Sequence, residues 1–170
     1  ALGGRPLVMG ILNITPDSFA DTERLDTARA VDAALAMEAA GADILDVGGE
    51  STRPGAVPVD AGEELRRVLP VLRGLAGRLS IPVSIDTYKA PVAEAALAAG
   101  AELVNDISGL TLGPGAAAAA RDAGAGYVLN YSYSVPKRRP DQPPLYEDVV
   151  VDTVAWMEQR LDELQSAGLP

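Results

Sequence analysis

The chain has 170 residues, of which 48% are hydrophobic and 4% aromatic, so one domain with an aliphatic core is expected. Its formal net charge of −10 argues against general nucleic-acid binding and against binding to an anionic membrane surface. Cysteine and histidine are both absent, which excludes a disulfide framework, a thiolate zinc site, a Ser-His triad and histidine metal ligands. Any metal would therefore be a hard ion bound by oxygen atoms.

Apolar runs in the sequence all fall short of the ~18 residues that a membrane-spanning helix needs. The N-terminus carries no basic segment followed by an apolar one, which is the pattern of a signal peptide. A cytoplasmic protein is therefore expected.

The first predicted element is a buried strand over residues 7–12, an unbroken apolar run that ends at Asn13. Further short apolar runs predict strands over residues 43–47, 81–85, 102–104 and 127–129. Helical spacing between them predicts helices over residues 27–40, 60–79, 89–99, 116–123 and 147–167. Pro70 lies inside the second of these helices and is expected to kink or split it.

Strands and helices therefore alternate strictly through five repeats, which predicts a parallel sheet with right-handed crossovers. Length alone favours an open doubly wound sheet, because a (β/α)8 barrel needs eight repeats and about 250 residues.

A polar group follows each predicted strand, namely Asn13, the loop over residues 48–53, Asp86, Asn105 and Asn130. Because the carboxyl ends of parallel strands meet at one edge of a sheet, these groups are expected to share one site. A carboxylate and several amides suit a flat heterocycle that carries both hydrogen-bond donors and acceptors. Asn13 could also bind Mg²⁺ or a phosphate oxygen.

These residues also have structural interpretations. Asp86 could cap the third helix, Asn105 could belong to a turn, and Arg53 could be a solvated surface charge. Phe19 could belong to the core, and the basic cluster at residues 137–139 could be a solvated loop. The convergence of several polar groups at strand ends favours a functional site.

Five segments of the sequence form a distinctive set, namely Asn-Ile-Thr-Pro-Asp-Ser-Phe at 13–19, Gly-Ala-Asp at 41–43, Gly-Gly-Glu-Ser-Thr-Arg-Pro-Gly at 48–55, Ser-Ile-Asp-Thr at 84–87 with Lys89, and Asn-Asp-Ile-Ser-Gly at 105–109. Together they resemble the dihydropteroate synthase family of the folate pathway, whose fold is a TIM barrel. The resemblance implies a parallel (β/α)8 barrel, with about five βα units in one pterin-binding domain over residues 1–170. The barrel expectation replaces the length-based preference for an open sheet. The remaining C-terminal strands of the barrel are expected to exist outside these 170 residues.

The resemblance implies condensation of 6-hydroxymethyl-7,8-dihydropterin pyrophosphate with p-aminobenzoate, giving dihydropteroate and pyrophosphate. It also implies Mg²⁺ as cofactor, inhibition by sulfonamides and a homodimer. Two alternatives stay open, a non-catalytic pterin-binding paralogue and a methyltetrahydrofolate corrinoid methyltransferase. The Thr-Pro-Asp-Ser-Phe and Glu-Ser-Thr-Arg-Pro loops argue against the methyltransferase, because methyl transfer involves neither pyrophosphate nor p-aminobenzoate.

The resemblance also implies roles for single residues in the reaction. Asp86 and Asn105 would hold the pterin ring, and Asn13 would bind the metal ion and act in catalysis. Asp21 would help to stabilise the cation that develops on the pterin methylene group. The remaining expected substrate-binding residues are Thr52 at the pyrophosphate-bearing substrate, Phe19, Arg53 and Pro54 at the p-aminobenzoate slot, and Ser18.

The sequence departs from the family pattern in three places. Asn130 stands where the family usually has histidine after the fifth strand, and the loop after Asp21 lacks the usual glycine pair. The family's Asp-Pro-Gly segment, Ser-Arg-Lys loop and Arg-x-His segment, which supply a pterin-binding Asp, a Lys and the anion site, do not occur in these residues.

Overall fold

The computed structural model describes residues 4–14, 23–51, 53, 56–132 and 146–169. Helices and strands alternate along this part of the chain. In chain order they are β1 Met9–Asn13, α1 Glu23–Ala39, β2 Ile44–Gly48, α2 Ala61–Leu75, β3 Val83–Asp86, α3 Ala90–Ala98, β4 Leu103–Asp106, α4 Gly115–Ala123, β5 Gly126–Leu129 and α5 Val149–Ser166.

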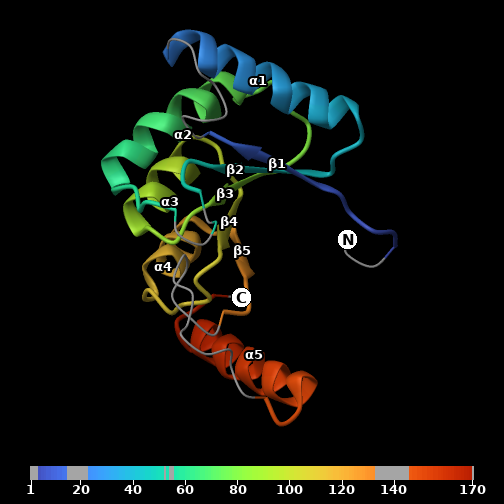
Figure 1. The fold of residues 1–170 in the computed structure, drawn as a ribbon, viewed down its shortest axis with the longest axis vertical. Helices are drawn as coiled ribbons and strands as arrows, with labels where there is room; N and C mark the ends of the chain where they lie inside the picture. The colour runs from blue at the N-terminus through green and yellow to red at the C-terminus, as the bar shows by residue number, and fades with distance from the viewer. Residues whose placement is uncertain (1–3, 15–22, 52, 54–55, 133–145, 170) are drawn as a thin grey trace.

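The five described strands form one parallel sheet in the order β1-β2-β3-β4-β5. Each strand from β2 to β5 therefore pairs with the strand that precedes it in the sequence. Figure 1 shows the sheet fanning from β1 to β5 with α2, α3 and α4 along one side of it. Neighbouring helices pack in the same sequence, α1 on α2, α2 on α3 and α3 on α4.

This strand order decides between the two expected architectures. An open doubly wound sheet reverses its strand order at a switch point and carries helices on both faces. The described strands show no such reversal, and a sequential order with the helices on one side is the arrangement of a barrel wall. The length-based preference for an open doubly wound sheet is therefore wrong, and the fold is part of a (β/α) barrel.

The hydrophobic core lies between the sheet and the helices. Side chains on the helix-facing side of the strands, such as Leu45, Val47, Ile85 and Val104, are fully buried. The helices contribute mainly small residues and valine, because alanine lets a helix lie close to the sheet. The residues that line the core from the helices include Ala30, Ala34, Val68, Val71, Val92, Ala93, Ala96, Ala116 and Ala120.

Helix α2 differs from its predicted bounds at its C-terminal end. The spacing predicts a helix to residue 79, but α2 ends at Leu75. Gly77 has a φ of +70°, a conformation that glycine adopts readily and that stops a helix. Pro70 neither ends nor splits α2, since the helix continues beyond it.

The other predicted elements are confirmed within a few residues, with α1 beginning four residues before its predicted start. In the described part of the chain, no helix is long and apolar enough to cross a membrane.

Candidate active site

A row of polar positions crosses the sheet at the carboxyl ends of four strands. In register, Asn13 pairs with Gly48, Gly48 with Asp86, and Asp86 with Asn105. Side chains alternate between the two faces of a strand, and the residues next to this row along the chain are buried under the helices. The row therefore lies on the face turned away from the helices, and the predicted convergence of Asn13, Asp86 and Asn105 is confirmed.

Gly48 leaves space in the middle of this row. A Cβ atom built on Gly48 would lie 3.4 Å from Asp86 Oδ2 and 3.5 Å from Asn13 Oδ1. Any larger residue here would fill the gap between the carboxylate and the amide. The sequence thus places a glycine where two oxygen-bearing side chains approach each other.

Asp86 has an unusual protonation equilibrium. Burial raises the pKa of its carboxyl from 3.8 to about 7, and the charges of Asp46, Glu64, Asp106 and Glu50 add to the effect. A carboxyl group that titrates near neutrality can accept two N–H groups when ionised and can donate one O–H when protonated. Such perturbed groups in a shared site are typical of functional positions.

Two side-chain amides continue the row beyond Asp86. Asn105 Nδ2 donates to Asp46 Oδ2 over 3.0 Å, and Asn130 Nδ2 donates to Asn105 Oδ1 over 2.8 Å. Asn130 Nδ2 also lies 3.1 Å from the carbonyl oxygen of Asp106. A carboxylate, two amides and a main-chain carbonyl thus form one connected chain across β2, β4 and the end of β5.

Asp46 and Ser84 form the floor below the row. They are paired in register on β2 and β3, and each is at least 96% buried. Among the described atoms, Asp46 Oδ1 and Ser84 Oγ have no hydrogen-bond partner. A buried polar atom without a partner lowers stability, so these two atoms are a cost to folding in this arrangement.

A buried ion cluster lies beside the site, under the loop that follows β2. Lys89 Nζ forms ion pairs with Glu50 and with Glu64, whose side chain is 1% exposed. Tyr88 donates its hydroxyl hydrogen to Glu50 Oε1 over 3.1 Å, and the Val59 N–H donates to the same oxygen. Burial alone would lower the pKa of Lys89, but the two carboxylates outweigh it and raise that pKa. The cluster joins the loop after β2 to α2 and to the start of α3.

Asp106 lies on the helix-facing side of β4 and has a structural role. Its Oδ1 accepts the Ser108 N–H over 2.7 Å, and its Oδ2 accepts the Tyr127 hydroxyl over 2.7 Å. Burial and this hydrogen bond to Asp106 raise the pKa of Tyr127. These bonds fix the loop after β4 against β5.

Two structural interpretations can now be decided. Lys89 occupies the N-cap position of α3, and the Thr87 hydroxyl accepts the Lys89 N–H over 3.2 Å, so Asp86 does not cap that helix. Asn105 is a strand residue of β4 and does not belong to a turn.

One further predicted site residue, Arg53, lies among the described residues, and it is exposed. Five further predicted residues and the basic cluster lie outside the described residues, namely Ser18, Phe19, Asp21, Thr52, Pro54 and residues 137–139.

The sequence analysis missed Asp46 and the ion cluster around Lys89. A signal for Asp46 was present, because it is a charged residue in the middle of an apolar strand, Ile-Leu-Asp-Val-Gly. No spacing rule joins Lys89 to Glu50 and Glu64, which lie 39 and 25 residues away from it. Their proximity depends on packing.

Magnesium ions in proteins keep several water ligands and often share substrate phosphates with one or two protein oxygens. Within the described residues, no group of three or more acidic, histidine or cysteine side chains could hold a metal ion. The exposed amide oxygen of Asn13, beside Asp86, fits a metal ion that arrives with a phosphate-bearing ligand. It does not fit a site built from protein ligands alone.

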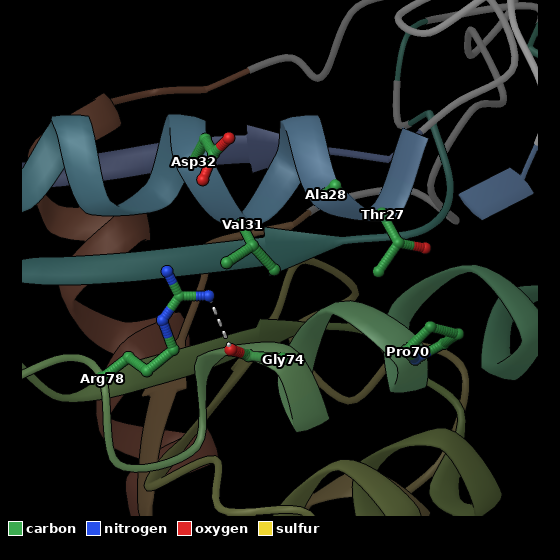
Figure 2. Close-up of a pocket in the computed structure, with 7 residues that line it drawn as sticks. All are labelled: Thr27, Ala28, Val31, Asp32, Pro70, Gly74 and Arg78. Carbon is green, nitrogen blue, oxygen red and sulfur yellow. Dashed lines mark hydrogen bonds between the residues drawn. The ribbon is translucent and has the colours of Figure 1, made fainter. Parts of the chain in front are cut away.

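A separate hollow of about 480 Å³ lies between α1 and α2, away from the strand ends. Figure 2 shows Val31 of α1 facing Gly74 of α2, with Arg78 donating a hydrogen bond to the Gly74 carbonyl. A Cβ atom on Gly74 would lie 2.8 Å from Val31 Cγ2, so this glycine allows the two helices to approach. The hollow belongs to helix packing and not to the row of polar groups.

Comparison with known proteins gives consistent matches. The family model described as "Pterin binding enzyme" matches residues 9–170. Dihydropteroate synthase of Mycobacterium leprae is 46% identical over 163 residues, which are 95% of this chain and 57% of that protein. The chain thus spans little more than half the length of this curated relative.

Solved structures agree with the sequence matches. Dihydropteroate synthase of Clostridium difficile, solved in the presence of pteroic acid, has a TM-score of 0.88 at 39% identity, covering 99% of this chain and 62% of that one. The Yersinia pestis dihydropteroate synthase, solved as a sulfonamide drug complex, has a TM-score of 0.86 at 41% identity, covering 98% of this chain and 60% of that one.

Proposed function

This chain belongs to the pterin binding enzyme family, and we propose that it supports the dihydropteroate synthase reaction. The amino group of p-aminobenzoate would attack the exocyclic methylene carbon of 6-hydroxymethyl-7,8-dihydropterin pyrophosphate. The bond between that carbon and the pyrophosphate oxygen would break, pyrophosphate would leave with the electron pair, and the amine would lose a proton. The observation that carries this proposal is the row formed by Asn13, Asp86 and Asn105.

The geometry suits the pterin ring in a specific way. A pterin presents an amino group, ring N–H groups and a carbonyl along its edges, so it needs both acceptors and donors. Asp86 supplies a carboxylate, and Asn105 supplies an amide whose second N–H and second oxygen lone pair are available in addition to its bonds to Asp46 and Asn130. Because Asp86 is desolvated, a hydrogen bond to it is stronger than it would be in water.

Catalysis of this step depends on stabilising the departing pyrophosphate and on excluding water, which competes with p-aminobenzoate as nucleophile. We propose that Asn13 binds a Mg²⁺ ion together with the pyrophosphate oxygens. When bound, the ion would neutralise the charge of the leaving group. Arg53, on the loop after β2, is proposed to contact p-aminobenzoate. The homodimer remains a prediction from the family resemblance, and the cytoplasmic location remains a prediction from the sequence pattern.

The proposal is tested by calorimetry followed by turnover. Pterin pyrophosphate should bind to the purified protein, and addition of p-aminobenzoate should then release pyrophosphate. A sulfonamide should inhibit competitively with p-aminobenzoate. Binding without turnover would support the non-catalytic pterin-binding alternative, and the absence of pterin binding would refute the proposal.

Asp86→Asn provides the residue-level test. The variant should bind the pterin more weakly by about 2–3 kcal/mol, because a charged acceptor for ring N–H groups is lost. Asp162→Asn, the same change at an exposed position of α5, is the matched control and should bind normally. Equal affinities of the two variants would contradict the pterin site.

A further inference from the structure

We propose that Asp46 and Asn130 are positioning residues that fix which way the side-chain amide of Asn105 faces. The proposal deepens the proposed function and rests on it, because Asn105 is placed at the pterin ring there. Neither Asp46 nor Asn130 is proposed to touch the substrate.

An asparagine side chain has a donor end and an acceptor end of nearly the same shape, so its orientation depends on its partners. Asn105 has partners on both ends. Its Nδ2 donates to Asp46 Oδ2 over 3.0 Å, and its Oδ1 accepts from Asn130 Nδ2 over 2.8 Å. Rotation by half a turn would place Oδ1 against a carboxylate oxygen and Nδ2 against another NH₂ group. Two hydrogen bonds would be replaced by two repulsive contacts.

The orientation of Asn130 is fixed in turn by the main chain. Its Nδ2 also donates to the carbonyl oxygen of Asp106 over 3.1 Å, and a carbonyl oxygen can only accept. The backbone of Asn130 is held as well, since Gly109 has a φ of +55° and no Cβ, which lets the Asn130 carbonyl and the Trp156 ring lie against it. Asn130 therefore offers a donor to Asn105.

Asp46 has features that stability alone does not explain. It is 4% exposed, its Oδ1 has no hydrogen-bond partner among the described residues, and its charge raises the pKa of Asp86. A buried carboxylate with one side-chain partner is unfavourable for folding. An ionised carboxylate can only accept hydrogen bonds, however, so Asp46 requires the NH₂ end of the Asn105 amide to face β2. A neutral amide at position 46 could adapt to either orientation.

Asn130 stands where the family resemblance predicts histidine, and this chain has no histidine. A histidine ring N–H could donate to Asn105 Oδ1 in the same way as the Asn130 amide does. Asn130→His should therefore preserve the function of the residue, whereas Asn130→Leu, which is similar in size and cannot donate, should not.

The experiment compares Asp46→Asn, Asn130→Leu and Asn130→His with the parent protein, and uses Asp162→Asn on α5 as the matched surface control. We expect Asp46→Asn and Asn130→Leu to raise the Kd for pterin pyrophosphate at least tenfold. The KM for p-aminobenzoate should stay within twofold in both variants. Asn130→His and the control should stay within threefold of the parent Kd.

Two further readouts separate positioning from a structural role. The free energy of unfolding of Asp46→Asn should equal or exceed that of the parent, because a buried charge is removed. In ¹⁵N NMR spectra without ligand, the side-chain NH₂ signals of Asn105 should move in Asp46→Asn and in Asn130→Leu. Unmoved Asn105 signals, or affinity losses that follow losses of stability, would overturn the proposal. If the parent protein fails to bind pterin, the proposed function is refuted. The NMR comparison still decides whether Asp46 and Asn130 hold the side-chain amide of Asn105 in one orientation.

Discussion

The raised pKa of Asp86 makes folding stability depend on pH in a defined direction. The pKa of this carboxyl is 3.8 in an unperturbed chain and about 7 in the folded protein, through burial and neighbouring negative charges. Between these values the folded protein binds more protons than the unfolded chain, so stability falls as pH rises, and the loss is complete above about pH 7. Three pKa units correspond to about 4 kcal/mol. Solvent screens this half-buried group, so we expect about 2 kcal/mol.

Asp86→Asn removes the titration and keeps the shape of the side chain. Urea unfolding at pH 5, 7 and 9 should show the variant more stable than the parent by about 2 kcal/mol at pH 9, by nearly as much at pH 7, and by less than half as much at pH 5. The exposed Asp162→Asn control should show no such trend. A stability difference that is constant with pH, or that grows toward acid pH, would refute the reasoning. Carboxyl ¹³C NMR would measure the pKa of Asp86 directly.

Further changes test the packing around the site, each by urea unfolding. Lys89→Met leaves two buried carboxylates facing each other and should lower the free energy of unfolding by about 3–5 kcal/mol, whereas Lys89→Arg should lower it less. Equal losses of stability in the two variants would contradict a charge effect. Gly109→Ala should lower the free energy of unfolding by about 2 kcal/mol or more, because a Cβ there would lie 2.6 Å from the Trp156 ring. Gly113 also has a positive φ but has open space around it, so Gly113→Ala should cost only about 1 kcal/mol. Equal costs would show that backbone strain alone matters. Asp60→Ala removes the side-chain cap of α2 and should lower the free energy of unfolding by about 1 kcal/mol, while Asp60→Ser should lower it little. Unchanged stability in Asp60→Ala would show that the cap is not needed.

Much of the secondary structure could be predicted from sequence because its signals are local. Apolar runs predicted the strands, and helical spacing predicted the helices between them. The end of α2 was misplaced, because helical spacing continues to residue 79 while Gly77 already stops the helix. Pro70 was expected to kink or split α2, yet the helix continues through it to Leu75.

The site was predicted in part for the same reason. Asn13, Asp86 and Asn105 each end a strand, and the parallel topology alone brings such residues to one edge. Asp46, Lys89 and its glutamate partners could not be placed this way. They meet across several segments, and only packing sets which side chains face each other.

The amino-acid sequence by itself determined the alternation of strands and helices, the polar row at the strand ends and the family of the chain. Those properties depend on local periodicity and on the order of residues along the chain. Only the tertiary structure decided that the described strands follow one another without a switch point, that Asp86 titrates near neutrality, and that Asn105 is held between Asp46 and Asn130. The physical reason is that desolvation and hydrogen-bond orientation depend on neighbours that are distant in the sequence, and the folded chain alone brings them together.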